Sequence, residues 1–296
     1  MKSQTDKLRE ILARDICQAM PCCWDGLSAR MIEQAGFPVT FMSGFAVSAS
    51  RIGAPDTGLI SYGEIVDQAR NICQAVSIPV IGDGDTGYGN ALNVKRTVEG
   101  YARAGCAAIM IEDQVAPKRC GHTKGKLIVS REEALERVQA AVDARNEGTN
   151  ILILARTDAR ATHGLDEALW RAREFSRIGA DILFVEAPRD EAEMRRVTSE
   201  VPGVHMANMV EGGATPVKSP AELGELGFRL AAYPLTLMSA AMKAMRDSLA
   251  AFNEGRHPAD LVLDFAELRR IVGFDAYYEQ ETRYAASSRE KPKAAE

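Results

Sequence analysis

The chain has 296 residues, of which 46% are hydrophobic and 26% are charged, and its formal net charge at pH 7 is −5. Acidic and basic residues are mixed along the chain, which excludes the basic stripe of a nucleic-acid-binding protein. No run approaches the ~20 apolar residues of a membrane span, and the N-terminal MKSQTDKLREILARD lacks the apolar core of a secretory signal. We therefore expect a cytoplasmic protein that binds neither nucleic acid nor membrane.

The six cysteines are expected to be reduced thiols. The chain is long, shows no secretory signal and contains no Cys-x-x-Cys pair, and its histidines are scattered. These features argue against a disulfide framework and against a structural zinc site. Cys17, Cys73 and Cys106 have apolar neighbours in the sequence and are expected to pack as small core residues.

Short apolar runs alternate with longer amphipathic segments throughout the chain. The apolar runs predict eight strands buried on both faces, over 16–22, 39–44, 78–85, 107–113, 151–158, 181–187, 204–210 and 228–234. Amphipathic patterns predict intervening helices over 26–36, 90–105, 130–145, 165–179 and 219–227. Asn90 is an expected N-cap and Gly105 an expected helix stop. Ser130 and Glu133 match a capping box.

Eight strand–helix units in roughly 240 residues predict a closed (β/α)8 barrel. A doubly wound open sheet is the alternative, but its Gly-x-Gly-x-x-Gly fingerprint is absent after the first strand. Helices are expected beyond the eighth strand, over 236–253 and within 259–285. We expect one domain over residues 1–285, and a disordered polar tail over 286–296.

The reactive groups of such a barrel lie at the carboxyl ends of its strands. Polar residues follow most of the predicted strands: Ser43 with Gly44, Asp83 with Asp85, Glu112, Arg156 with Asp158, Glu186, and Asn208. Capping and turn chemistry would explain one or two of these. It does not readily explain acidic groups from successive units, because buried unpaired carboxylates are costly.

The stretch GDGDTGYG, residues 82–89, is the most informative strand end. On an extended strand Asp83 and Asp85 would point to one side, where they repel unless a cation or a shared proton lies between them. With Glu112 nearby, the oxygen-rich set suits a partly hydrated Mg²⁺ or Mn²⁺. The alternative is a glycine-rich turn in which the aspartates bind backbone amides.

A metal at this position would need an anionic oxygen from a substrate. Arg156 is placed to bind a carboxylate bidentately, and Ser43 with Gly44 could donate hydrogen bonds. The alternative for Arg156 is a structural ion pair with Asp158 or Glu186.

Cys120 has an unusual sequence environment in EDQVAPKRCGH, residues 112–122. Lys118 and Arg119 precede it and His122 follows, and such neighbours favour thiolate over thiol. The alternative is a surface loop rich in basic residues that happens to contain a cysteine.

The segments DGDTGYGN, IEDQVAPKRCGH, ARTDAR, VEAP and ANMVEGGATP together resemble the isocitrate lyase / phosphoenolpyruvate mutase superfamily. The similarity runs in order over nearly the whole chain. The Lys-Arg-Cys-Gly-His segment resembles its carbon–carbon lyase branch, that of the 2,3-dimethylmalate and 2-methylisocitrate lyases. The GDGDTG and MVEGGATP segments are more similar to dimethylmalate lyase and the petal death protein than to methylisocitrate lyase.

The resemblance implies a set of site residues. Mg²⁺ would be held through Asp83 and Asp85, with Asp56 and Glu112 engaging its waters. A substrate pocket is implied with the residues Ser43, Gly44, Phe45, Cys120, Gly121, Arg156, Glu186 and Asn208. Residues 114–128 would form a mobile lid that carries Cys120. The last helix would be exchanged between subunits in a dimer of dimers, a homotetramer.

The implied reaction cleaves the C2–C3 bond of a 2-hydroxy dicarboxylate to an α-keto acid such as pyruvate and a carboxylic acid. Cys120 would protonate the departing carbanion as a neutral thiol, while Lys118 and His122 tune its proton affinity and bind the leaving carboxylate. Glu186 or a metal-bound water would take the alcohol proton.

Several alternatives stay open on the same scaffold. They are 2-methylisocitrate cleavage, oxaloacetate hydrolysis or decarboxylation, phosphonopyruvate-type chemistry, and a non-catalytic binding role. Two further arginines of methylisocitrate lyases, which hold the third carboxylate of their substrate, align with Ser239 and Glu267 here. A smaller 2-alkylmalate, such as 2,3-dimethylmalate, is therefore the expected substrate.

Overall fold

The computed structural model describes residues 2–121 and 125–285. They fall into two compact units, divided between Ala240 and Ala241. None of the described helices is long and apolar enough to cross a membrane. The predicted tail, 286–296, and the candidate His122 lie outside the described residues.

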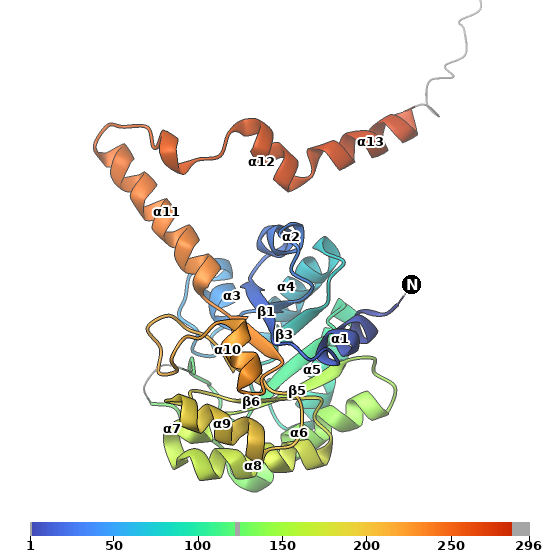
Figure 1. Ribbon diagram of the computed structural model, residues 1–296. Helices are drawn as coiled ribbons and strands as arrows, with labels where there is room; N and C mark the ends of the chain where they lie inside the picture. Colours follow the sequence, from blue (N-terminus) through green and yellow to red (C-terminus); the bar gives the residue numbers. More distant parts are fainter. Residues whose placement is uncertain (1, 122–124, 286–296) are drawn as a thin grey trace, which may run out of the picture. The chain divides into compact units, whose positions relative to one another are not determined.

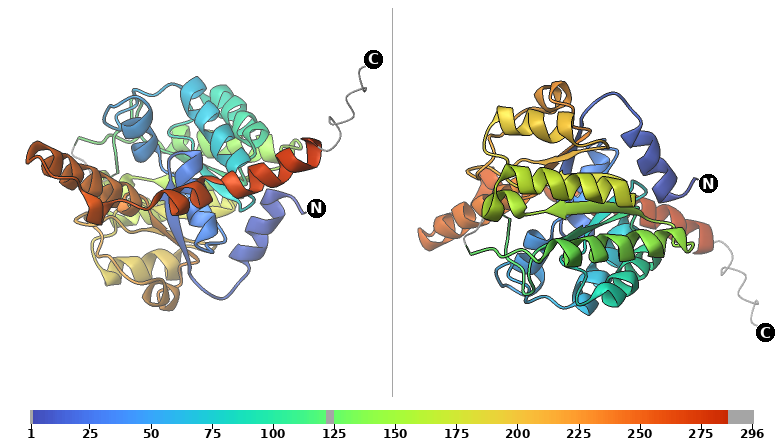
Figure 2. Two further views of the ribbon diagram at one scale, coloured as in Figure 1. Left: turned by 90° about the horizontal axis from the view of Figure 1, so that it is seen from above. Right: turned by 90° about the horizontal axis from the view of Figure 1, so that it is seen from below.

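The first unit contains eight parallel strands with helices around them (Figures 1 and 2). The strands are β1 (Gln18–Cys23), β2 (Thr40–Met42), β3 (Val80–Asp83), β4 (Ala108–Glu112), β5 (Leu152–Thr157), β6 (Ile182–Val185), β7 (Met206–Asn208) and β8 (Leu230–Tyr233). Every one lies within a predicted strand or extends one residue past it, because parallel strands buried on both faces are nearly continuous apolar runs.

The sheet closes on itself. The order β6-β5-β4-β3-β2-β1-β8-β7 joins all eight strands, and a parallel bridge between Leu183 and His205 links the two ends of that order. In the register of β4 and β5, Glu112 lies opposite Arg156. The closed barrel is confirmed, and the doubly wound sheet is excluded.

Helices precede and connect the strands. They are α1 (Gln4–Leu12), α2 (Gly26–Gln34), α3 (Gly44–Arg51), α4 (Tyr62–Ala75), α5 (Ala91–Ala104), α6 (Arg131–Asn146), α7 (Ala159–His163), α8 (Leu165–Ile178), α9 (Glu191–Glu200) and α10 (Pro220–Glu225). The Asn90 side chain caps α5 and Gly105 ends it in the left-handed conformation. The capping box predicted for α6 forms only in part: Ser130 accepts the Glu133 N–H, but the Glu133 carboxylate binds Arg137.

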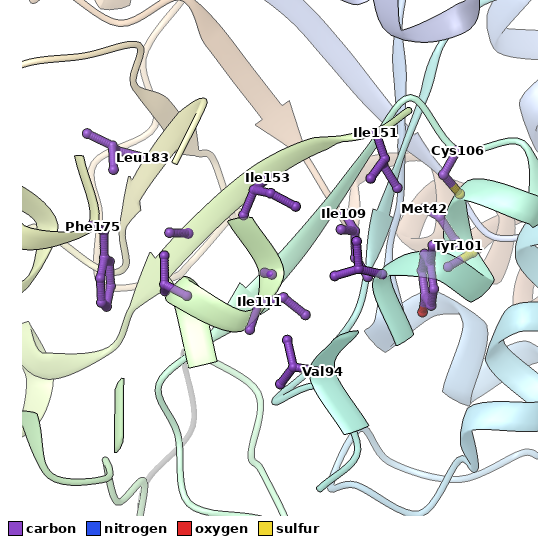
Figure 3. Close-up of a cluster of buried hydrophobic side chains, with 14 of the residues drawn as sticks. Met42, Val94, Tyr101, Cys106, Ile109, Ile111, Ile151, Ile153, Phe175 and Leu183 are labelled. Carbon is purple, nitrogen blue, oxygen red and sulfur yellow. The ribbon is translucent and has the colours of Figure 1, made fainter. Parts of the chain in front are cut away.

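Buried apolar side chains form three clusters in this unit. One cluster lies between the strands and the outer helices and includes Tyr101, Ile109 and Phe175 (Figure 3). A second cluster includes Met20, Met110 and Phe184, from β1, β4 and β6. A third, smaller cluster includes Met209 and Leu223. The three clusters hold the strand ends in place, and so position the polar residues that follow them.

All six cysteines are described and all are thiols. Cys17 and Cys106 are buried, and the half-buried Cys73 has its sulfur 3.7 Å from that of Cys106. The prediction that these residues pack as small apolar side chains is confirmed for the two buried ones.

The second unit is helical. Helix α11 (Thr236–Asn253) runs into it from the first unit, followed by a 3₁₀ turn, η1 (Ala259–Leu261), and by α12 (Phe265–Val272) and α13 (Phe274–Ala285). Large apolar side chains are exposed on these elements, among them Leu249, Phe252, Phe265 and Tyr277. The predicted helices are confirmed, whereas exchange of the last helix between subunits stays a prediction.

Candidate active site

A cavity of about 220 Å³ opens at the carboxyl ends of the strands. Its lining comes from nearly every strand end: Phe41, Ser43, Phe45, Asp56, Asp83, Met110, Lys118, Arg119, Cys120, Gly121, Arg156, Phe184, Glu186, Met206, Asn208, Val210, Ala232, Pro234 and Leu235. Ten of the fourteen residues predicted for the site line this cavity. Gly44, Asp85 and Glu112 contact residues that line it, as described below, and His122 is not described.

Strand β3 ends at Asp83, and the chain then turns. The Asp83 carboxylate accepts the N–H of Gly44 at 3.2 Å and that of Asp85 at 3.0 Å. Asp85 adopts a left-handed conformation with φ of 48°, which aspartate tolerates better than most residues. The expectation that both aspartates lie on one extended strand is therefore wrong, and the alternative of aspartate binding backbone amides holds for Asp83.

Gly44 allows this close approach. A Cβ atom at Gly44 would lie 2.5 Å from Oδ2 of Asp83, far inside van der Waals contact. Ser43 just before it caps α3 by accepting the N–H of Ala46. The strand predicted over 39–44 ends at Met42, and a helix that was not predicted begins at Gly44, for which Ser43 is a favourable N-cap.

The Lys118 ammonium group lies among the carboxylates. Its Nζ atom is 2.6 Å from Oδ1 of Asp56 and 2.9 Å from Oδ1 of Asp85, and all three side chains are buried. Burial alone would lower the pKa of Lys118, but the surrounding carboxylates, led by Asp85 and Asp83, hold it well above its usual range. Lys118 is thus a fixed positive charge beside the acidic groups. Its predicted role in tuning Cys120 stays a prediction.

Two of the acidic groups resist ionisation. Burial raises the pKa of Asp85 to about 7, with Asp83 and Asp56 adding to the effect and Lys118 opposing it. Burial also raises the pKa of Glu112 well above its ordinary value, although Arg156 opposes this. The Oε1 atom of Glu112 is buried with no hydrogen-bond partner among the described residues. A further positive charge beside these carboxylates would let them ionise.

The donor set fits a hydrated Mg²⁺ better than a fully protein-ligated ion. Asp56, Asp83, Asp85 and Glu112 supply hard oxygen atoms, and the unpartnered Glu112 oxygen is available to a cation or its water. No group of three acidic, cysteine or histidine side chains in the described parts of the chain converges as a ready-made metal cluster. Mg²⁺ commonly takes one or two carboxylates and keeps several waters, so this arrangement is compatible with it.

Arg156, at the end of β5, is surrounded by carboxylates. Its guanidinium group pairs with Glu112 at 3.2 Å, with Asp158 at 2.9 Å and with Glu186 at 3.2 Å. The ion pair with Asp158 or Glu186, which the sequence left open as an alternative, is therefore present. Arg156 also lines the cavity. These ion pairs therefore fix the orientation of its guanidinium group relative to a ligand bound there.

Glu186 and Asn208 lie side by side at the ends of β6 and β7. The Asn208 amide nitrogen is 3.3 and 3.4 Å from the two carboxylate oxygens of Glu186. Glu186 Oε1 also accepts the N–H of Ala187, whose φ is 60°. The cavity therefore presents a buried carboxylate beside a guanidinium group and an amide, a set able to bind and orient a polar substrate or to take a proton.

Cys120 and Gly121 line the cavity from the segment after β4. A Cβ atom at Gly121 would lie 2.4 Å from Oε2 of Glu186 and 2.5 Å from an Nη atom of Arg156. The backbone at Gly121 thus lies directly on these two side chains. This contact places the Cys120 segment across the polar end of the cavity.

Two buried side chains near this segment are not predicted by the sequence patterns. Lys126 pairs with Asp158 at 2.8 Å and donates to the carbonyl of Gly121. Gln114 binds the backbone of Arg119. Nothing in their neighbours marks them, because a lysine and a glutamine in a polar loop are expected at the surface.

A closed (β/α)8 barrel with carboxylates, an arginine and a cysteine around a cavity at its strand ends is typical of an enzyme active site. Comparison with protein families identifies which enzymes this one resembles. The phosphoenolpyruvate phosphomutase family matches residues 8–253. The chain belongs to the phosphoenolpyruvate mutase / isocitrate lyase superfamily, as the motifs predicted.

Individual relatives are more specific. The chain is 44% identical to a protein of Eubacterium barkeri named 2,3-dimethylmalate lyase, over 94% of this chain and 97% of that one. A solved structure of 2,3-dimethylmalate lyase superposes with a TM-score of 0.91 at 37% identity, covering 96% of each chain.

Two other solved structures have different activities in their names. Oxaloacetate acetylhydrolase in complex with 3,3-difluorooxalacetate has a TM-score of 0.91 at 33% identity, covering 96% of this chain and 97% of that one. Phosphonopyruvate hydrolase in complex with oxalate and Mg²⁺ has a TM-score of 0.84 at 28% identity, covering 96% of this chain and all of that one. Keto-acid chemistry thus recurs on this scaffold, and one such relative holds magnesium.

Proposed function

We propose that this protein is a Mg²⁺-dependent carbon–carbon lyase that cleaves a 2-alkylmalate, such as 2,3-dimethylmalate, to pyruvate and a carboxylic acid. One observation carries the proposal: a thiol, a guanidinium group and three buried carboxylates border the same cavity, and Asp85 and Glu112, whose pKa values are raised by burial, pair with Lys118 and Arg156 of its wall. The 44% identity to a 2,3-dimethylmalate lyase supports the choice of substrate.

Different residues around the cavity would bind the substrate and the metal ion. Arg156, already oriented by its carboxylate partners, binds the substrate's 1-carboxylate. Ser43 and Phe45 line the same cavity and support the keto-acid fragment, while the N–H of Gly44 between them is bonded to Asp83. Asp83 and Asp85 would hold Mg²⁺, with Asp56 and Glu112 acting through its water molecules. The bound ion would supply polarisation of the substrate's 2-oxygen.

Bond cleavage needs one proton removed and one delivered. Loss of the proton from the 2-hydroxyl lets the C2–C3 bond break, giving the keto acid and a carbanion next to the second carboxylate. Glu186, which is buried and faces the cavity, is the base among the chain's own residues. Cys120, as a neutral thiol, donates its proton to the carbanion, and Lys118 and His122 support that fragment's carboxylate.

The cavity wall favours a substrate with an alkyl group. Phe184, Val210 and Leu235 line it together with Met110 and Pro234, and such a wall stabilises apolar groups. Oxaloacetate hydrolysis is the second candidate, because the oxaloacetate acetylhydrolase structure superposes as well as that of the lyase. Oxaloacetate carries no alkyl branch that would use this wall.

A substrate panel separates the candidates. Purified protein with Mg²⁺ is incubated with 2,3-dimethylmalate, 2-methylisocitrate and oxaloacetate, and pyruvate and oxalate are assayed. We expect pyruvate from dimethylmalate, loss of turnover with EDTA, and recovery on adding Mg²⁺. Release of oxalate and acetate from oxaloacetate, with no malate cleaved, would refute the lyase proposal. Cys120→Ser should lose most turnover yet still bind a keto acid.

We also propose a homotetrameric, cytoplasmic enzyme. The exposed Leu249, Phe252, Phe265 and Tyr277 of the second unit support association with further copies, because exposed apolar surface of this kind marks interaction sites. Sedimentation equilibrium of the full chain tests this, and a monomer at micromolar concentration would contradict it.

A further inference from the structure

Cys120 is held from both sides by side chains that do not line the cavity. On one side, the Gln114 amide bonds the backbone of Arg119 twice: its oxygen accepts the Arg119 N–H at 2.9 Å and its nitrogen donates to the Arg119 carbonyl at 2.9 Å. A primary amide matches a peptide group in both donor and acceptor. Gln114 is 1% exposed, so these bonds are made away from water.

On the other side, Lys126 holds the residue after Cys120. Its Nζ atom donates to the carbonyl of Gly121 and lies 2.8 Å from Oδ1 of Asp158. The side chain is 4% exposed, and a buried ammonium group is costly unless it is paired and hydrogen-bonded. Asp158 also binds Arg156. Lys126 therefore connects the Cys120 segment to the guanidinium group at the end of β5.

The Gln114 anchor is itself fixed to the barrel. Its carbonyl accepts a hydrogen bond from the buried Arg137 of α6 at 2.7 Å, and its backbone forms an antiparallel bridge with Ile128. Arg137 also donates to the carbonyl of Glu112. The position of Gln114 is thus tied to the strand that carries Glu112.

We propose that Gln114 and Lys126 are positioning residues that together hold the Cys120 thiol at the cavity. The inference rests on the proposed function, in which Cys120 delivers a proton to carbon. Neither side chain touches the cavity, so each acts through the backbone of a neighbour of Cys120. Losing either should let the thiol leave its place, while Arg156 keeps its own ion pairs with Glu112, Asp158 and Glu186.

The test uses Gln114→Met and Lys126→Met, which keep chain length and remove the hydrogen bonds. Gln139→Met and Lys95→Met are matched controls, because among the described residues both side chains bond only surface carboxylates. The first readout needs no turnover: the full chain is alkylated with iodoacetamide and digested with trypsin. The rate at Cys120 is then divided by that at the half-buried Cys73, which serves as an internal reference.

We call Gln114 and Lys126 the clamp. Loss of one net hydrogen bond raises the fraction of molecules in which the thiol is displaced by about tenfold. We therefore expect the alkylation ratio to rise about tenfold in both clamp variants and to stay unchanged in the controls. The second readout is a split of the kinetic parameters. With the thiol misplaced by about 1 Å, kcat should fall about 10²-fold while KM changes little.

Gln114→Glu provides a second variant should Gln114→Met fail to fold. It keeps the acceptor for the Arg119 N–H and loses the donor, so its alkylation ratio should also rise. Unchanged ratios and unchanged kcat in folded variants would overturn the clamp and leave the lyase proposal intact. If the alkylation ratio rises in the variants but the parent protein shows no lyase turnover, the clamp is supported and the proposed reaction is refuted.

Discussion

Gly121→Ala tests whether the Cys120 segment lies directly on the polar end of the cavity. The added methyl group would meet Oε2 of Glu186 at 2.4 Å and an Nη atom of Arg156 at 2.5 Å. Ordinary van der Waals contact begins at 3.4 Å, so the segment and the two side chains must separate by about 1 Å. Both side chains are buried and paired, so the segment is the part that gives way.

A displacement of about 1 Å at the reacting groups costs about 10²-fold in rate. We therefore expect kcat/KM for keto-acid release to fall by about that factor. The backbone at Gly121 is not left-handed, so alanine brings no conformational strain, and the melting temperature should stay close to that of the parent.

The assay couples pyruvate release to NADH oxidation by lactate dehydrogenase. Gly63→Ala is the matched control, because a Cβ there would meet only the Ser61 hydroxyl, at 4.0 Å. A Gly121→Ala enzyme as fast as the parent would refute the placement of this backbone against Arg156 and Glu186. A large fall in melting temperature would contradict the expectation that the substitution displaces only the Cys120 segment.

Gly44→Ala places a methyl group 2.5 Å from Asp83 Oδ2, so Mg²⁺ affinity measured by calorimetry should fall about 10–100-fold, and unchanged affinity would remove Asp83 from the metal site. Arg171→Met leaves the buried Asp113 carboxylate without its cation and should lower the free energy of unfolding, measured in urea, by about 3–5 kcal/mol. Arg177→Ala, at an exposed position, should change it by less than about 0.5 kcal/mol. Equal effects of the two substitutions would contradict a stabilising role of the buried ion pair. Arg131, with Arg171, holds the pKa of Glu167 at about 2, below its ordinary 4.5. The stabilising effect of the Glu167 carboxylate is therefore fully present above pH 4.5 and is lost as the pH falls to about 2. The melting temperature of Glu167→Gln should therefore lie below that of the parent at neutral pH and converge with it near pH 2, whereas a gap that persists at pH 2 would show that charge is not the cause.

Local patterns in the sequence were sufficient for the architecture. The eight apolar runs became eight strands, and Asn90 and Gly105 bound α5 as predicted. The reason is that burial on both faces and helix capping depend on neighbours within a few residues. The sequence patterns do not predict helices α1, α3, α4, α7 and α9. Four of these are nevertheless capped by a side chain, from Ser3, Ser43, Ser61 and Asp190.

Much of the candidate site also followed from the sequence. Parallel strands in a barrel bring their carboxyl ends to one face, so Asp83, Glu112, Arg156, Glu186 and Asn208 could be grouped without coordinates. The motifs supplied the remaining members, among them Asp56 and Phe45, through resemblance.

Only the tertiary structure decided which of these groups meet. It placed the Lys118 ammonium group between Asp56 and Asp85, turned Asp85 out of the extended conformation, and buried Lys126 against Asp158. A long side chain in a loop can reach many partners, and no local pattern records which one it finds. The partner is set by where the strands place their ends and by the requirement that each buried charge be paired.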